Sequence, residues 1–165
     1  MCHYDASRER QQPCAPAPFA PAHAETLSGP IKVIDAGSLR IAGQTIRLRG
    51  IATPTPDDRC PFRNVTIACG RVATTALMDL TAGTEVICEL PDDSNRSSTL
   101  WATCKAKGYD LSEGMIYTGY ARATKSAPAH YRQVEAASRK RKRGLWRGDF
   151  PDAVNDAVNR AATRR

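Results

Sequence analysis

Three short runs in the first third of the chain alternate between apolar and polar side chains, and they limit the possible folds most. Ile31–Asp35, Ser38–Ile41 and Thr45–Ile51 each show this alternation, and turns around Gly37 and Gly43 separate them. A period of two is typical of half-buried strands, and tight glycine turns join antiparallel neighbours. The segment therefore predicts three short antiparallel strands.

The later segments predict a mixture of helices and strands. In chain order we expect a loop, a helix, two strands, a short helix and a long helix, at Thr53–Arg63, Gly70–Leu80, Glu85–Leu90, Leu100–Ala106, Asp110–Tyr117 and Pro128–Arg143. Five short strands with an interposed helix fit a small closed barrel. The expected class is α+β, mainly β, with about three helices.

Composition changes at both ends of this region. Residues 1–28 hold four prolines and no strand-like alternation, and residues 151–165 form a short tail with a basic end. We expect a folded domain over residues 29–150. The leader reads Ala-His-Ala before Glu25, which matches a signal-peptidase site, although prolines interrupt the apolar stretch before it. An exported protein, periplasmic or secreted, is expected. A disordered arm on a cytoplasmic protein is the alternative.

The net charge of the chain is +7. A basic surface attracts polyanions such as nucleic acid, but such a charge also serves solubility alone. No apolar run is long enough to span a bilayer, so we expect no transmembrane segment, and we expect a monomer.

Several short motifs follow one another along the chain. Val33–Leu39 resembles a V-x-D-G-D-T turn, Ile46–Pro54 resembles I-R-L-x-G-I-D-x-P, and Cys69–Ala73 resembles C-G-x-x-A. With Gly119–Ala121 and Gly144–Trp146, which resemble a C-terminal signature, these motifs in this order resemble the thermonuclease, or staphylococcal nuclease-like, family. The resemblance covers about residues 30–150. It implies an OB-type β-barrel and cleavage of phosphodiesters with one calcium ion.

The departures from the family pattern fall on its functional positions. Asp35 matches the first aspartate of the turn, Arg47 the first catalytic arginine, and Thr53 a ligand that contributes only backbone oxygen. Four functional positions carry other residues: the two aspartate ligands, the glutamate that acts on water and the second arginine correspond to Gly37, Ala52, Thr55 and Thr99. Each lost group is typically worth ~10²-fold or more in rate, so the resemblance implies a catalytically degenerate site.

A rearranged site is the alternative to a degenerate one. Asp57 and Asp58 lie in the adjacent loop, and Arg96 lies shortly before Thr99. Asp57 and Asp58, with Asp35 and Thr53, could hold calcium from shifted positions, and Arg96 could supply the missing positive charge. We expect no cofactor, and calcium only if the site is active.

Four of the six cysteines fall in the domain. Cys88 and Cys104 lie on neighbouring expected strands, while Cys60 and Cys69 bracket the loop before the first helix. We expect disulfides Cys60–Cys69 and Cys88–Cys104. Other pairings, or free thiols in a cytosolic protein, remain open.

The densest run of charge ends the long expected helix, at Arg139, Lys140, Arg141, Lys142 and Arg143. Cations there stabilise a helix C-terminus, and the same run is a candidate docking patch for a polyanion. The sequence leaves three function classes open. The first is an exported, catalytically inactive nuclease-like domain that binds a polyanion. The others are a calcium-dependent endonuclease with a rearranged site and a structural role at the cell envelope beside exopolysaccharide machinery.

Overall fold

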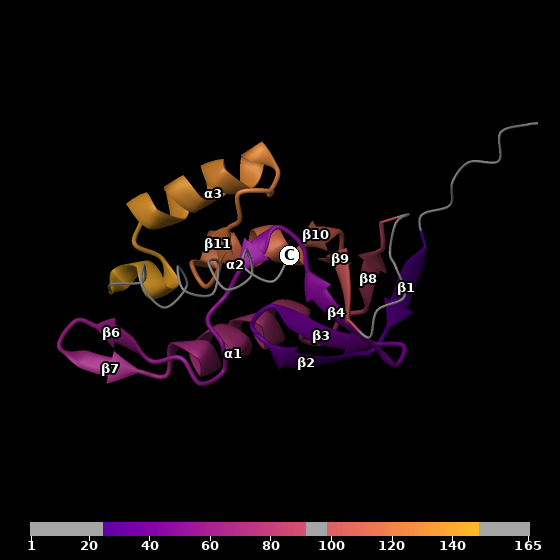
Figure 1. Ribbon diagram of the computed structural model, residues 1–165, viewed down its shortest axis with the longest axis horizontal. Helices are drawn as coiled ribbons and strands as arrows, with labels where there is room; N and C mark the ends of the chain where they lie inside the picture. Colours follow the sequence, from indigo (N-terminus) through magenta and orange to yellow (C-terminus); the bar gives the residue numbers. More distant parts are fainter. Residues whose placement is uncertain (1–24, 92–98, 149–165) are drawn as a thin grey trace, which may run out of the picture.

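A curled β-sheet forms the body of the protein, with three helices packed around it (Figure 1). The computed structural model describes residues 25–91 and 99–148. The main sheet is 7-stranded, in the order β1-β8-β9-β4-β3-β2 with β10 beside β9. Its strands are β1 (Thr26–Gly29), β2 (Ile31–Asp35), β3 (Ser38–Ile41), β4 (Gln44–Leu48), β8 (Val86–Glu89), β9 (Thr99–Ala106) and β10 (Tyr109–Asp110). Only β4 and β9 pair in parallel.

The sheet curls because its two edge strands are consecutive in the chain. β1 and β2 lie at opposite ends of the strand order, with only Pro30 between them. Gly29 has a φ of 137°, and Pro30 has no N–H to donate to a ladder, so the chain bends here. β1 also contacts β3, which brings the two edges toward each other. The α+β, OB-like architecture expected from the sequence is confirmed.

The strand expected over Thr45–Ile51 is two elements. β4 ends at Leu48, and β5 (Ile51–Ala52) leaves the sheet to pair with β11 (Arg122–Ala123). Gly50 lies at the break with a φ of 77°, and a Cβ there would lie 3.0 Å from the Tyr131 ring. The left-handed backbone and the close ring both favour glycine, so the chain turns at this residue.

The expectation of an irregular loop over Thr53–Arg63 is wrong at its end. β6 (Cys60–Phe62) and β7 (Val65–Ile67) form a separate hairpin. A disulfide joins Cys60 to Cys69, and both cysteines pack with Leu145 and Trp146 in a small second hydrophobic cluster. These contacts are distant in sequence, which is why local composition did not predict the hairpin.

The boundary expected at residue 28 is also wrong, because β1 pairs with β8 in register from Thr26 to Gly29. Pairing with a strand sixty residues away leaves no local signal. The rest of the expected leader, the tail over residues 151–165 and Arg96 lie outside the described residues.

Each expected helix is present with slightly different ends. α1 spans Cys69–Thr81, α2 Leu111–Thr118 and α3 Ala129–Lys140, and a 3-10 turn, η1, follows at Gly144–Arg147. The main core is formed by buried side chains from the sheet and from α1 and α2, among them Leu39, Ile46, Leu48, Leu77, Met115 and Ile116. None of the helices in the described part of the chain is long and apolar enough to cross a membrane.

The second disulfide joins Cys88 to Cys104, which are direct cross-strand partners on β8 and β9. Both side chains are fully buried in the main core. The two bonds are those expected from the sequence. A disulfide of this kind typically adds about 2–4 kcal/mol of stability.

One carboxylate connects α2 to α3. Asp110 caps α2 by accepting hydrogen bonds from the backbone N–H groups of Ser112 (2.8 Å) and Glu113 (3.4 Å). The hydroxyl of Tyr131 on α3 donates to the other oxygen of the same carboxylate. Burial, and then the hydrogen bond to Asp110, raise the pKa of Tyr131 above its usual value. The neutral phenol is therefore the form that the folded state favours.

We predict that Tyr131→Phe lowers the free energy of unfolding by about 1–3 kcal/mol, because one oxygen of Asp110 then loses its donor. Urea denaturation near neutral pH measures this, with Tyr109→Phe as the control, since Tyr109 is 79% exposed. Equal stabilities of the two variants would contradict the prediction.

The same pair predicts a loss of stability in alkali. A raised folded-state pKa means that the unfolded Tyr131 ionises first, so this contribution is complete below about pH 10 and falls as the pH rises above it. Tyr131→Phe should therefore lose less stability than the natural chain between about pH 9 and pH 11. Parallel curves for the two proteins would argue against the linkage.

Candidate functional site

The turn between β2 and β3 holds the first candidate residue. Asp35 ends β2, and its Oδ1 accepts a hydrogen bond of 2.8 Å from the backbone N–H of Gly37. Ala36 and Gly37 are buried behind it. One oxygen of this carboxylate is thus used to form the turn.

The side chain of Thr53 fills the space beside Gly37. A Cβ built on Gly37 would lie 2.9 Å from Thr53 Oγ1 and 3.5 Å from its Cγ2. Real Cβ atoms essentially never come as close as the first distance. A larger residue at position 37 would therefore have to displace Thr53. Thr53 follows β5, so two candidate positions that are distant in sequence meet here.

Ala52 and Thr55 lie on either side of Thr53 and Pro54. Ala52 ends β5 and packs against the second hydrophobic cluster, and Thr55 is exposed. A Cβ on Gly70 would come within 1.7 Å of the Thr55 carbonyl oxygen, so the first turn of α1 lies directly against this loop. The backbone around Thr55 is thereby held in place, and its side chain is a hydroxyl facing solvent.

The two loop aspartates differ in their surroundings. Asp58 Oδ2 accepts a hydrogen bond of 2.7 Å from the backbone N–H of Thr55, and the Asp58 N–H donates back to the Thr55 carbonyl at 3.0 Å. Asp57 is exposed. Asp58 therefore closes the turn rather than pointing toward Asp35.

Calcium prefers six to eight oxygen ligands, mostly carboxylates and carbonyls. Gly37 and Ala52, the two positions that the resemblance gives as aspartate ligands, carry no oxygen in their side chains, and Thr53 offers its backbone oxygen. Asp35 is the one carboxylate beside them. Across residues 25–91 and 99–148, no three Asp, Glu, His or Cys side chains gather closely enough to hold a metal ion. The donor set of these described residues does not fit calcium.

Arg47 lies on β4 beside an exposed aromatic side chain. It is the register partner of Ser38 on β3 and of Trp101 on β9, and its guanidinium carbon is 5.4 Å from the centre of the Trp101 ring. Trp101 is 47% exposed. Thr99 pairs with Thr45, one pleat away on the same face. The structure thus brings Arg47 and Thr99 to neighbouring strands.

The residues of the basic run Arg139–Arg143, which begins in the last turn of α3, differ in their contacts. Arg143 stacks at 3.8 Å over Tyr117 and donates to its hydroxyl at 3.1 Å, and Arg139 lies 5.5 Å from the Trp146 ring. Lys140, Arg141 and Lys142 are exposed. α3 lies on the side of the molecule away from β2 and β3 (Figure 1). The run is therefore separate from the Arg47 region.

Lys32 and Arg40 are exposed cations that the sequence analysis did not single out. They face each other directly on β2 and β3. Their alternation with buried or half-buried residues in both predicted strands is the signal that could have found them.

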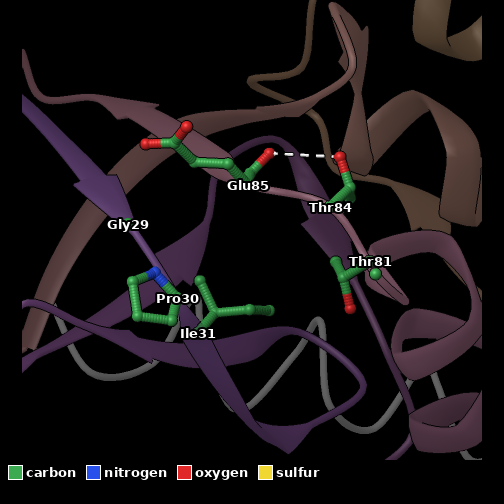
Figure 2. Close-up of a pocket in the computed structure, with 7 residues that line it drawn as sticks. Gly29, Pro30, Ile31, Thr81, Thr84 and Glu85 are labelled. Atoms are coloured by element: carbon green, nitrogen blue, oxygen red, sulfur yellow. Dashed lines mark hydrogen bonds between the residues drawn. The ribbon is translucent and has the colours of Figure 1, made fainter.

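The hollow drawn in Figure 2 lies elsewhere. Gly29, Pro30 and Ile31 line one side, and Thr81, Gly83, Thr84 and Glu85 line the other. Glu85 is its one charged lining residue, and the Thr84 hydroxyl contacts the Glu85 carbonyl at 3.5 Å. The hollow adjoins the start of β2, whereas Asp35 ends it, so it is not part of the candidate site.

A family model described as Staphylococcal nuclease homologue matches residues 45–148. The chain belongs to this family. The match runs from β4 to the end of η1 and includes all three helices, Arg47, and the positions of Ala52, Thr53, Thr55 and Thr99. No curated protein matches the chain.

In this staphylococcal nuclease homologue, the Gly37–Thr53 contact predicts energetic coupling between the two positions. Gly37→Ala should lower the free energy of unfolding by about 1 kcal/mol, since the added Cβ would meet Thr53 Oγ1. In the Thr53→Ala background, Gly37→Ala should lower the free energy of unfolding by much less. A double-mutant cycle by urea denaturation measures the difference, expected at about 0.5–2 kcal/mol.

Gly114→Ala is the matched control for that cycle. A Cβ there would meet only the flexible end of Leu80, at 3.2 Å. Gly114→Ala should change the free energy of unfolding by the same amount whether position 53 holds threonine or alanine. A coupling for Gly37 no larger than that for Gly114 would contradict the packing described.

Proposed function

We propose that this protein is an exported, non-cleaving member of the nuclease family that binds an anionic polymer, nucleic acid first among them. It acts as a monomer without a cofactor. One observation carries the proposal: the Thr53 side chain occupies the space that a side chain at position 37 would need.

Loss of catalysis follows from the chemistry of the remaining groups. With both aspartate ligand positions substituted, by Gly37 and Ala52, calcium would be held weakly. Thr55 offers a hydroxyl, which cannot take a proton from water near neutral pH as a glutamate can. Thr99 brings no charge to stabilise a developing phosphate oxyanion beside Arg47. Each deficit lowers the rate, and together they favour binding without cleavage.

Binding to a polyanion is supported by charge. The chain carries a net charge of +7. Arg47, Lys140, Arg141 and Lys142 are exposed, and none of them is in an ion pair within the described ranges. Exposed unpaired cations can release counterions from a polyanion, which is the main source of non-specific affinity.

Export is supported by the two disulfides. Structural disulfides are typical of oxidising compartments. The Leu90 N–H donates to the Glu25 carbonyl at 2.9 Å. Cleavage after Ala24 would therefore keep this bond and every residue of β1.

We predict that the purified, oxidised chain does not cleave single-stranded DNA or RNA at high protein concentration, with calcium or with chelator. The triple variant Gly37→Asp/Ala52→Asp/Thr55→Glu, in a Thr53→Ala background, tests whether the two ligand positions and the position of the water-activating glutamate are responsible. Calcium-stimulated cleavage by the natural chain would overturn the proposal and favour a rearranged endonuclease site at Asp35, Asp57 and Asp58.

We also predict that the chain binds nucleic acid with a steep dependence on salt. Arg47→Gln should reduce the slope of log K against log[salt] by about 1, since one phosphate contact is lost. Arg71→Gln, an exposed arginine on α1, is the control and should leave the slope unchanged. The combined Lys140→Gln, Arg141→Gln and Lys142→Gln variant tests whether the run at the C-terminal end of α3 also contacts the polymer. Absence of both cleavage and binding would favour an envelope role.

A further inference from the structure

The β6–β7 hairpin, η1 and the last turn of α3 together form a strongly basic end of the molecule (Figure 1). Gly148, directly after η1, lies against β6, since a Cβ built on it would be 2.7 Å from the Pro61 carbonyl oxygen. Arg139 on α3 lies over the Trp146 ring of η1. Residues 60–67 and 136–148 therefore form one continuous surface, which we call the basic end. Its cations are Arg63, Arg139, Lys140, Arg141, Lys142, Arg143 and Arg147, and the two segments contain no acidic residue.

Two aromatic rings hold some of these cations in place. Arg143 stacks at 3.8 Å over the Tyr117 ring and donates to its hydroxyl at 3.1 Å. Arg139 lies 5.5 Å from the centre of the Trp146 ring. These contacts leave the guanidinium charges in place, and the ion pairs among the described residues include no cation of the basic end. Its positive charge is therefore available to an outside partner.

Helix stability accounts for the first cations of the run but not for Lys142. Arg139 and Lys140 lie in the last turn of α3, where positive charge interacts favourably with the helix dipole. Lys142 follows the C-cap residue Arg141 and has a φ of 48°, in the left-handed region that glycine adopts with the least strain. The side chain of Lys142 is exposed. Stability of the fold would favour glycine at this position, so it does not explain the lysine.

Exposed apolar side chains accompany the charge. The β6–β7 hairpin turns between the register partners Phe62 and Val65, and Val65 is 61% exposed. Arg63 in the turn lies 5.8 Å from the centre of the Phe62 ring. The Cys60–Cys69 disulfide and the second hydrophobic cluster hold the base of the hairpin. The hairpin therefore presents an apolar side chain and a cation together at its tip.

We propose that the basic end is a docking surface for a membrane that contains anionic phospholipid. Lys140, Arg141 and Lys142 contact headgroup phosphates, and Val65 enters the boundary between headgroups and acyl chains. Clusters of about four to eight lysines and arginines are typical of surfaces that bind anionic lipids. The attachment is peripheral and reversible, because it uses charge and a small apolar tip. It goes beyond the proposed function and does not depend on it, since the run at the end of α3 is separate from the Arg47 region.

The combination of charge and apolar side chains favours a bilayer over a soluble polyanion. Nucleic acid or a sulfated polysaccharide would meet the cations and leave Val65 in solvent. A bilayer presents phosphates in one plane above an apolar layer, so it meets both kinds of side chain at once. Val65 should therefore contribute to binding of a bilayer and not to binding of a soluble polyanion.

The decisive experiment measures co-sedimentation of the oxidised full chain with vesicles at about 0.1 M salt. One vesicle is phosphatidylcholine alone, and the other contains phosphatidylglycerol at roughly one lipid in three. The natural chain should bind only the second. The combined Lys140→Gln/Arg141→Gln/Lys142→Gln variant should bind it about 100-fold more weakly, since each cation near an anionic surface contributes about 5-fold. Equal binding by the variant and the natural chain would overturn the proposal, as would no binding by the natural chain.

Three glycine substitutions separate charge at this surface from backbone strain and from net charge. Lys142, Lys107 and Ala42 are exposed and have φ values of 48°, 51° and 48°. Lys142→Gly should weaken vesicle binding about 5-fold while raising the midpoint of thermal unfolding by about 2 °C. Ala42→Gly should raise the midpoint without changing binding. Lys107→Gly removes a charge from the turn between β9 and β10, away from the hairpin, and should leave binding unchanged (Figure 1). Equal weakening by Lys107→Gly and Lys142→Gly would show a response to net charge alone and contradict the proposed surface.

Val65→Ser tests the apolar contact and distinguishes lipid from nucleic acid. It should weaken vesicle binding about 5-fold and leave the affinity for single-stranded DNA unchanged. Thr66→Ser, at the next exposed position of β7, is the control and should change neither. Thermal unfolding checks that each variant is folded. If Val65→Ser binds vesicles as tightly as the natural chain, the proposed docking is wrong.

The outcomes separate this inference from the proposed function. If the natural chain binds the anionic vesicles but no nucleic acid, the proposed function fails and the docking surface stands. If the combined glutamine variant loses affinity for single-stranded DNA and keeps its vesicle binding, the basic end contacts nucleic acid and the docking proposal fails.

Discussion

The parallel pairing of β4 with β9 is the contact on which the rest of the structure depends. It joins an antiparallel unit, β2-β3-β4, to a second one, β1-β8-β9, which is built around the Cys88–Cys104 disulfide. Parallel neighbours need a long crossover, and here it consists of β5, the disulfide-bound hairpin, α1 and β8. The same pairing sets Arg47 beside Trp101, so these two side chains meet where the two units join.

A second constraint holds the C-terminal elements, and it acts through backbone rather than side chains. Cβ atoms on Gly119 and Gly144 would lie 2.3 Å from the Arg143 carbonyl and 2.5 Å from the Thr118 carbonyl. Only glycine at both positions lets the end of α2 meet the start of η1 so closely, where the Leu145 N–H donates to the Gly119 carbonyl at 3.0 Å. This contact holds Leu145 and Trp146 against the Cys60–Cys69 disulfide and so connects the C-terminal turn to the hairpin.

The sequence predicted what depends on local pattern and missed what depends on distant partners. β2, β3 and the three helices follow from periodicity and turn residues, and the positions of Gly37, Ala52 and Thr55 follow from motif spacing. β1 and the β6–β7 hairpin could not be predicted in this way, because β8 and the Cys60–Cys69 bond stabilise them. The break at Gly50 had a signal, since glycine within a strand pattern often marks a close approach. No pattern could reveal that Thr53 lies against Gly37 or that Asp58 bonds Thr55.

The residues that still match the nuclease motif share a property that the substituted ones lack. Asp35 bonds the Gly37 N–H and so forms the turn between β2 and β3, and Thr53 fills the space beside Gly37. Arg47 lies on the central strand β4 against Trp101. Each of these side chains contributes to the shape or the charge of the barrel surface without any metal. The carboxylates absent at positions 37, 52 and 55 would have repelled one another and Asp35 unless a cation neutralised them. With Gly37, Ala52 and Thr55 at these positions, Asp35 is the one carboxylate left beside the turn, and it uses one oxygen to bond the Gly37 N–H, so the local structure holds together without a cation.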